Sequence, residues 1–178
     1  MTTQDALDDL QNFLQKAVQE MQMAYQKQET DPPEYVTPYV VQCYWPHKNF
    51  IPGDFQAPGI LIALDSTEDT GRENTVDVRL VCTTYGGGKY QGTDIPDAYG
   101  YKDLLSMMER LKTALVTQEV IGRSGLRRPI SMGMYDGELA WPFWYGYLRF
   151  ALDIPVTEYP MRGEYTNEME AFLYGDRR

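Results

Sequence analysis

Apolar and polar residues alternate most clearly late in the chain, from Trp144 to Ile154. One face of this segment holds Trp144, Gly146, Leu148, Phe150, Leu152 and Ile154, and the other holds Tyr145, Tyr147, Arg149, Ala151 and Asp153. A period of two residues is typical of a β-strand. Upstream, Ile130, Met132 and Met134 alternate with Ser131, Gly133 and Tyr135 in the same way.

The segment from Arg128 to Pro155 therefore predicts a β-hairpin. Asp136-Gly137 offers a residue pair that tolerates the positive φ of a tight turn. The tip of the hairpin is expected to be aromatic, with Trp141, Pro142, Phe143 and Trp144. At about 3.3 Å per residue the second strand runs about 35 Å, well beyond the usual strand. We expect it either to bulge near Gly146 or to reach past its own domain.

Helical spacing of apolar residues predicts a helix from Thr3 to about Gln28. Its apolar stripe holds Leu7, Leu10, Leu14, Ala17, Val18, Met21 and Tyr25. Thr2 or Thr3 can cap its first turn, and Asp31-Pro32-Pro33 is expected to end it.

A second helix is predicted from Tyr101 to about Thr117. Its apolar stripe consists of Leu104, Met107, Met108, Leu111 and Leu115. Charged residues occupy the rest of its surface, so this helix is expected to cover one face of the sheet.

A second hairpin is predicted in the middle of the chain. Gly59 to Leu64 forms a buried strand, Asp65 to Asn74 a polar turn, and Thr75 to Thr84 the returning strand. The inner face of that returning strand holds Val76, Val78, Leu80 and Cys82. The proline-rich region before it, from Pro32 to Pro58, has room for one strand at Tyr39 to Trp45. Tyr85 to Gly100, with its glycines, is expected to be a long flexible loop.

Together these elements predict an α+β fold, with a mostly antiparallel twisted sheet of long hairpins covered by the two helices. We expect residues 1–178 to form a single domain. Its parts are an N-terminal helix over 1–30, a proline-rich extended segment over 31–58, an α/β core over 59–155 and a C-terminal extension over 156–178.

Composition narrows the functional classes. The formal net charge is −10, and such a surface repels the phosphates that a nucleic-acid-binding protein must neutralise. No apolar run is long enough to cross a bilayer, and the polar N-terminal residues do not resemble a signal peptide, so we expect a soluble, cytoplasmically made protein. Cys43 and Cys82 are expected to be reduced packing residues.

The fourteen tyrosines, with three tryptophans and six phenylalanines, are many for one core. Aromatic side chains are enriched where proteins meet, because they bury much area at a low entropic cost. They also have a high β propensity, so any single tyrosine is at least as readily explained as a sheet residue.

Candidate chemistry is weak. Gly86-Gly87-Gly88-Lys89 lacks the spacing and the following helix of a phosphate-binding loop. Four carboxylates, Asp65, Glu68, Asp69 and Glu73, could hold a hard cation but fit a solvated turn better. His47 is the only histidine, and no nucleophile motif accompanies it. We therefore expect no enzymatic activity, no metal and no cofactor.

Arg123, Arg127 and Arg128 form the one notable basic cluster of the sequence. Two interpretations are equally favoured. The cluster is either a solvated turn or a charge partner for an acidic neighbour across an oligomer interface.

The run from Pro58 to Pro155 resembles the tail terminator, or tail completion, proteins of long-tailed bacteriophages and prophages. The resemblance rests on the segments GILIALDS, TVDVRLVCTTY, the glycine-rich loop, YGYKDLLSMMERLKTAL, RPISMGMY and above all WPFWYGYLRFALDIP. It covers a little over half of the chain. The aromatic turn leading into a strand that ends in Ile-Pro is its most distinctive part.

This resemblance implies a small α/β protein that assembles as a hexameric ring at the head-proximal end of the tail, in the tail or neck of the virion. Its implied partners are itself, the major tail tube protein and the head–tail connector, with DNA only passing through the lumen and no membrane. The alternatives are a head-side neck protein of the same virion and a ligand-binding module without catalysis.

We expect the subunit or tube interfaces to draw on the aromatic residues, the glycine-rich loop and the basic cluster. These candidates are Tyr85, Gly86, Gly87, Gly88, Lys89, Tyr90, Arg123, Arg127, Arg128, Trp141, Phe143, Trp144, Tyr145 and Tyr147.

Overall fold

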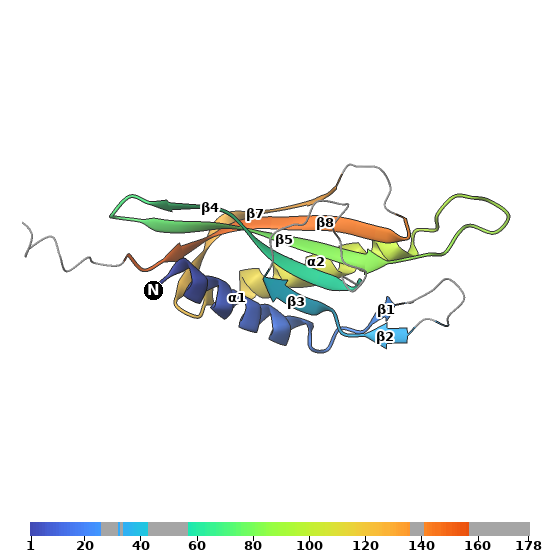
Figure 1. Cartoon of the computed structure of the whole chain (residues 1–178), viewed down its shortest axis with the longest axis horizontal. Helices are drawn as coiled ribbons and strands as arrows, with labels where there is room; N and C mark the ends of the chain where they lie inside the picture. The colour runs from blue at the N-terminus through green and yellow to red at the C-terminus, as the bar shows by residue number, and fades with distance from the viewer. Residues whose placement is uncertain (26–31, 33, 43–56, 136–140, 157–178) are drawn as a thin grey trace, which may run out of the picture.

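A curved sheet runs the length of the molecule in the computed structural model, which describes residues 1–25, 32, 34–42, 57–135 and 141–156 (Figure 1). Within these residues the sheet has six strands in the order β3-β4-β5-β8-β7-β6. The strands are β3 (Tyr39–Gln42), β4 (Gly59–Asp69), β5 (Asn74–Tyr85), β8 (Phe143–Ile154), β7 (Ser124–Met134) and β6 (Val120–Ile121). Only the β3–β4 pair is parallel, so the predicted α+β fold with a mostly antiparallel sheet is confirmed.

Strands β5 and β8 form the centre of the sheet. Their register runs without a shift from Asn74 opposite Ile154 to Tyr85 opposite Phe143. Strand β8 does not bulge near Gly146, and it does not reach past its own domain because its last residue, Ile154, is still paired and buried; both alternatives predicted for it are wrong. A register shift occurs instead between β8 and its other neighbour, β7, where the pairing is irregular between Arg127 and Ser131. The predicted alternation of β8 is confirmed, because the residues from Gly146 to Ile154 on its inner face are buried.

Both helices pack against the same face of the sheet (Figure 1). Helix α1 spans Thr3–Val18 and helix α2 spans Tyr99–Gln118. The apolar stripe predicted for α2 is buried throughout. The inner face predicted for β5 is buried as well, and burial raises the pKa of the Cys82 thiol. Cys43 lies outside the described residues.

Helix α1 begins as predicted but ends earlier. The Thr2 hydroxyl accepts a hydrogen bond from the Asp5 N–H at 3.1 Å, and the Asp5 carboxylate accepts one from the Thr2 N–H at 2.8 Å, which completes a capping box. The helix stops at Val18, so its predicted extension to Gln28 and its end at Asp31-Pro32-Pro33 are wrong.

A short strand replaces the predicted last turns of α1. Strand β1 (Met23–Tyr25) pairs with β2 (Glu34–Val36) in a small antiparallel sheet. Residues Met21 and Tyr25 are buried as their spacing suggested, but Tyr25 reaches the interior from a strand. Strand β2 was not predicted. The strand predicted from Tyr39 to Trp45 is present as β3, and positions 43–45 lie outside the described residues.

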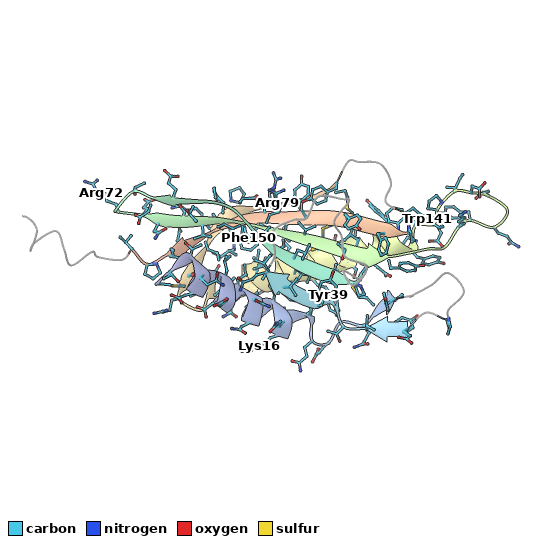
Figure 2. The ribbon with its side chains drawn as sticks, viewed as in Figure 1. Lys16, Tyr39, Arg72, Arg79, Trp141 and Phe150 are labelled. Atoms are coloured by element: carbon cyan, nitrogen blue, oxygen red, sulfur yellow. The ribbon has the colours of Figure 1, made fainter. Side chains whose placement is uncertain are left out.

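The β4–β5 hairpin is longer than predicted. Strand β4 continues through the polar residues to Asp69, and the turn occupies only 70–73. In the turn the Asp69 carboxylate accepts a hydrogen bond from the Gly71 N–H at 2.8 Å, and Gly71 has φ +75°. We call the exposed part of this hairpin, residues 65–75, the arm. It projects beyond the helices at one end of the molecule, where Figure 2 labels Arg72.

Three further predictions lie outside the described residues: the Asp136-Gly137 turn, the setting of His47, and the extension over residues 157–178. In the part of the chain that is described, no helix is long and apolar enough to cross a membrane.

Candidate interaction surface

The sheet register brings most of the predicted aromatic candidates to one end of the molecule, opposite the arm. Tyr85 ends β5, Phe143 begins β8, and the two are register partners. Their rings meet edge to face with centroids 5.6 Å apart. Trp144 follows in β8, and the centroid of its ring lies 6.1 Å from that of Tyr101 in α2. Figure 2 labels Trp141 at this end.

The glycine-rich loop packs against these aromatic residues through two glycines. The Gly86 carbonyl accepts a hydrogen bond from Trp144 Nε1 at 3.3 Å, and the Gly86 N–H donates to the Pro142 carbonyl at 2.8 Å. A Cβ at Gly86 would lie 2.6 Å from the Gly100 Cα, and a Cβ at Gly100 would overlap the Trp144 ring. Only glycine fits at these two positions, because the loop, the helix start and the indole meet there.

The rest of the loop folds back on itself beside Trp141. Lys89 forms an isolated bridge with Pro96, and the Tyr90 N–H donates to the Ile95 carbonyl at 3.0 Å. The Lys89 ammonium lies 5.0 Å from the centroid of the Trp141 ring and 3.3 Å from an Asp94 carboxylate oxygen. Lys89 is thus held by a ring and a carboxylate.

We call this assembly the aromatic end; it comprises Tyr85, Gly86–Lys89, Tyr101 and Trp141–Trp144. Exposed apolar side chains surround it, on the loop, on the start of α2 and on β2. They are Tyr90 (54% exposed), Ile95 (61%), Tyr99 (72%) and Tyr35 (70%). Sequence reasoning selected Tyr90 alone among these four. The available signal was that Ile95 and Tyr99 lie in a polar, glycine-rich stretch without apolar periodicity, where no core position is expected.

The basic cluster lies at the other end of the sheet. Arg127 contacts Glu73 and Asp153, each at 3.0 Å, and Arg128 contacts Glu119 at 3.5 Å. Both arginines belong to strand β7, so the prediction of a solvated turn is wrong for them; Arg123 is an exposed turn residue. The structure therefore places the glycine-rich loop, Trp141, Phe143 and Trp144 at one end of the sheet and the basic cluster at the other.

Tyr145 and Tyr147 lie on the face of the sheet away from the helices. The Tyr147 ring contacts Tyr135 at 5.2 Å and lies under the Arg149 guanidinium at 4.8 Å. Arg149 is also 3.8 Å from the Asp65 carboxylate, which makes a closer ion pair with Arg79. Hydrogen bonding to Asp65 raises the pKa of Arg79, and burial raises the pKa of Tyr145.

The four acidic residues considered as a cation site all lie in the arm, and two of them have arginine partners. Asp65 pairs with Arg79, and Glu73 pairs with Arg127. Across the described ranges, no group of three or more acidic, histidine or cysteine side chains is arranged to hold a metal ion.

Shallow hollows accompany these surfaces. One of about 330 Å³ lies on the outer sheet face, among Arg127, Arg128 and Arg149 and the acidic residues beside them. Another of about 400 Å³ lies between the β1–β2 sheet and α2, where burial raises the pKa of the Asp103 carboxyl. Carboxylates of the same chain already neutralise the charges of Arg127 and Arg149 in the first hollow.

No protein-family model matches the sequence, and no curated protein matches it significantly.

Proposed function

We propose that this protein caps the tail tube of a long-tailed bacteriophage as a ring of six copies, stops the growth of the tube and joins the tail to the head connector. The resemblance of the region from Pro58 to Pro155 supports this proposal. The observation that carries it is the aromatic end. There the most distinctive run of the resemblance, beginning at Trp141, packs against the glycine-rich loop.

The surfaces of the chain suit a subunit of such a ring. A closed ring needs two different contact surfaces on each subunit, and capping a tube needs a third. Tyr90, Ile95 and Tyr99 are exposed around the aromatic end, and such side chains often fill protein interfaces. The arm and the arginines of β7 lie at the far end of the same sheet. Contacts with different partners can therefore form without overlapping.

Electron microscopy of particles from the parent phage with this gene disrupted tests the proposal. We expect headless tails of abnormal, unregulated length. Tails of normal length that fail to join heads would place the protein on the head side of the joint. Infectious particles of normal form would contradict a role in virion assembly.

Complementation of the disrupted gene tests the aromatic end in particular. We expect Tyr90→Ser with Ile95→Ser to leave tails overgrown, because these exposed side chains would contact the tube. The matched control is Lys112→Ser on the exposed side of α2, which is also exposed and should restore normal tails. Equal rescue by both variants would show that the aromatic end does not contact the tube.

A further inference from the structure

The sheet has two open edges in its described part, one on each side. Strand β3 pairs with β4 only from Gly59 to Ile62, so β4 beyond that point pairs with β5 alone. On the opposite side, β6 pairs with β7 only at Ser124 and Gly125. Open edges are sites where another strand can add to a sheet.

The backbone groups that face outward on β7 follow from one hydrogen bond. The Tyr135 N–H donates to the Tyr145 carbonyl at 3.3 Å, which identifies these partners as a hydrogen-bonded pair. Such pairs alternate along an antiparallel ladder. Ser131 and Gly133 therefore face β8, while Met132 and Met134 direct their N–H and C=O groups toward the open edge.

The same reasoning applies to β4. The Thr70 N–H donates to the Glu73 carbonyl at 2.9 Å, so the hydrogen-bonded pairs that follow in the ladder involve Glu68 and Ser66. Thr67 and Asp69 accordingly direct their backbone groups away from β5. Each edge thus offers a short, regular stretch: Ser66–Asp69 on β4 and Ser131–Met134 on β7.

Direction and charge make the two edges complementary. Strands β4 and β7 are antiparallel, because each step of the order β4-β5-β8-β7 reverses the direction. In an antiparallel pair the start of one strand lies beside the end of the other. Arg127 and Arg128 precede the open stretch of β7, and Glu68, Asp69 and Glu73 lie at the end of β4 and in its turn.

We propose that β7 of one subunit adds, antiparallel, to β4 of the next copy of this chain, with Arg128 placed beside the acidic end of the arm. This inference rests on the proposed ring, and it names the surface that closes it. The contact is heterologous, because two different edges meet, and it repeats around a ring.

Bulges and charged side chains can also protect an edge strand against pairing with another chain. Here the irregularities lie at Asp65 on β4 and between Arg127 and Ser131 on β7, outside the two regular stretches. The ion pair of Arg128 with Glu119 does not compete strongly, since both side chains are more than 60% exposed and the closest atoms are 3.5 Å apart.

Disulfide trapping tests the contact in the full-length chain with Cys43 replaced by serine and Cys82 left buried. One set of variants carries Thr67→Cys or Glu68→Cys, and the other carries Ser131→Cys or Met132→Cys. We expect covalent dimers in oxidised mixtures of Thr67→Cys with Met132→Cys, and of Glu68→Cys with Ser131→Cys, because residues directly opposite each other share one face of a sheet. Chains that carry both cysteines should give a ladder of multimers, while each single variant should stay monomeric on non-reducing gels.

A charge exchange provides the matched test of register. Glu68→Lys in the Thr67→Cys chain should reduce its cross-linking to the Met132→Cys chain several-fold, and Arg128→Glu in the Met132→Cys chain should restore it. Lys112→Glu on the exposed side of α2 is the control and should restore nothing. Circular dichroism melts of the reduced proteins establish that each variant folds.

Three outcomes overturn the inference: no cross-link at the highest soluble concentration, dimers formed by the β7 cysteines alone, or restoration by the Lys112 control. These results are separable from the proposed function. Overgrown tails in the disrupted phage without cross-links leave the function standing and remove this contact. Cross-linked multimers with normal tails leave the contact standing and remove the function.

Discussion

The two ends of the central β5–β8 ladder are stabilised by different forces. At the aromatic end, Trp144 packs on Gly86 and Gly100 and donates a hydrogen bond to the Gly86 carbonyl, and the Pro142 carbonyl accepts one from the Gly86 N–H. At the other end, the arm has no apolar side chain on either face between Asp65 and Thr75, and ion pairs such as that of Arg127 with Glu73 lie beside it. Close side-chain packing thus stabilises one end of the sheet, and ion pairs lie at the other.

This comparison predicts that the two ends respond differently to substitution. A closely packed site loses stability when a substitution changes the side-chain volume. Exposed ion pairs contribute little to stability, and salt weakens them further. The following changes test that difference, from the largest expected effect to the smallest.

Trp144→Ala should lower the free energy of unfolding by about 3 kcal/mol, because it removes a large aromatic side chain from a packed site. Urea denaturation followed by circular dichroism measures the change. The control is Tyr99→Ala, at a residue that is 72% exposed, which should change stability by less than about 0.5 kcal/mol. Similar losses in both variants would mean that the aromatic end is not closely packed.

Gly100→Ala should cost about 2 kcal/mol, because the new methyl group overlaps the Trp144 ring. The same substitution should cost much less in a Trp144→Ala background, where the overlapping ring is absent. Urea denaturation of the two single variants and the double variant gives the coupling free energy between Gly100→Ala and Trp144→Ala. Additive losses would contradict the proposed contact.

Asp65→Asn should cost about 1 kcal/mol, since it leaves Arg79 and Arg149 without their shared carboxylate. The loss should shrink at high salt, where charges on the surface are screened. Thermal melts at low and high ionic strength measure both effects. A loss as large as that of Trp144→Ala, unchanged by salt, would remove the distinction between the two regions.

Thr2→Ala should cost about 0.5 kcal/mol through loss of the α1 cap, which lies near the arm end (Figure 1). Hydrogen bonding to Thr2 lowers the pKa of Asp5 below its ordinary value of 3.8. The ionised Asp5 carboxylate therefore stabilises the fold fully at pH values above 3.8. This stabilisation is lost as the pH falls through the lowered pKa. The difference between Thr2→Ala and the wild type in urea melts should therefore decrease toward acidic pH. A constant difference would show that the Thr2 hydroxyl does not contribute to the lowered pKa of Asp5, since alanine retains the backbone N–H that also donates to this carboxylate.

Periodic burial was predictable from the sequence. The stripe of α2 and the inner faces of β5 and β8 have apolar residues at regular spacing, because each element rests on one core. The chain between Val18 and Tyr25 misled the same reasoning. Met21 and Tyr25 fit helical spacing, yet Met23–Tyr25 pairs with β2, a partner ten or so residues away whose pairing no local pattern reveals.

The polar part of β4 escaped prediction for another reason. Residues from Ser66 to Asp69 are exposed on both faces, so they show no alternation, and they form a strand because β5 lies beside them. The aromatic candidates were predictable by composition, but the contact among Gly86, Gly100 and Trp144 depends on three segments that meet only in the fold.

The unbroken register of β5 and β8 has a mechanical consequence. A force that pulls β5 and β8 in opposite directions along their length loads the cross-strand bonds from Asn74 opposite Ile154 to Tyr85 opposite Phe143 together, so the strands do not separate one bond at a time. Separating the two strands in this direction therefore requires all of these bonds to break at once, which makes the centre of the sheet the part of the protein most resistant to pulling.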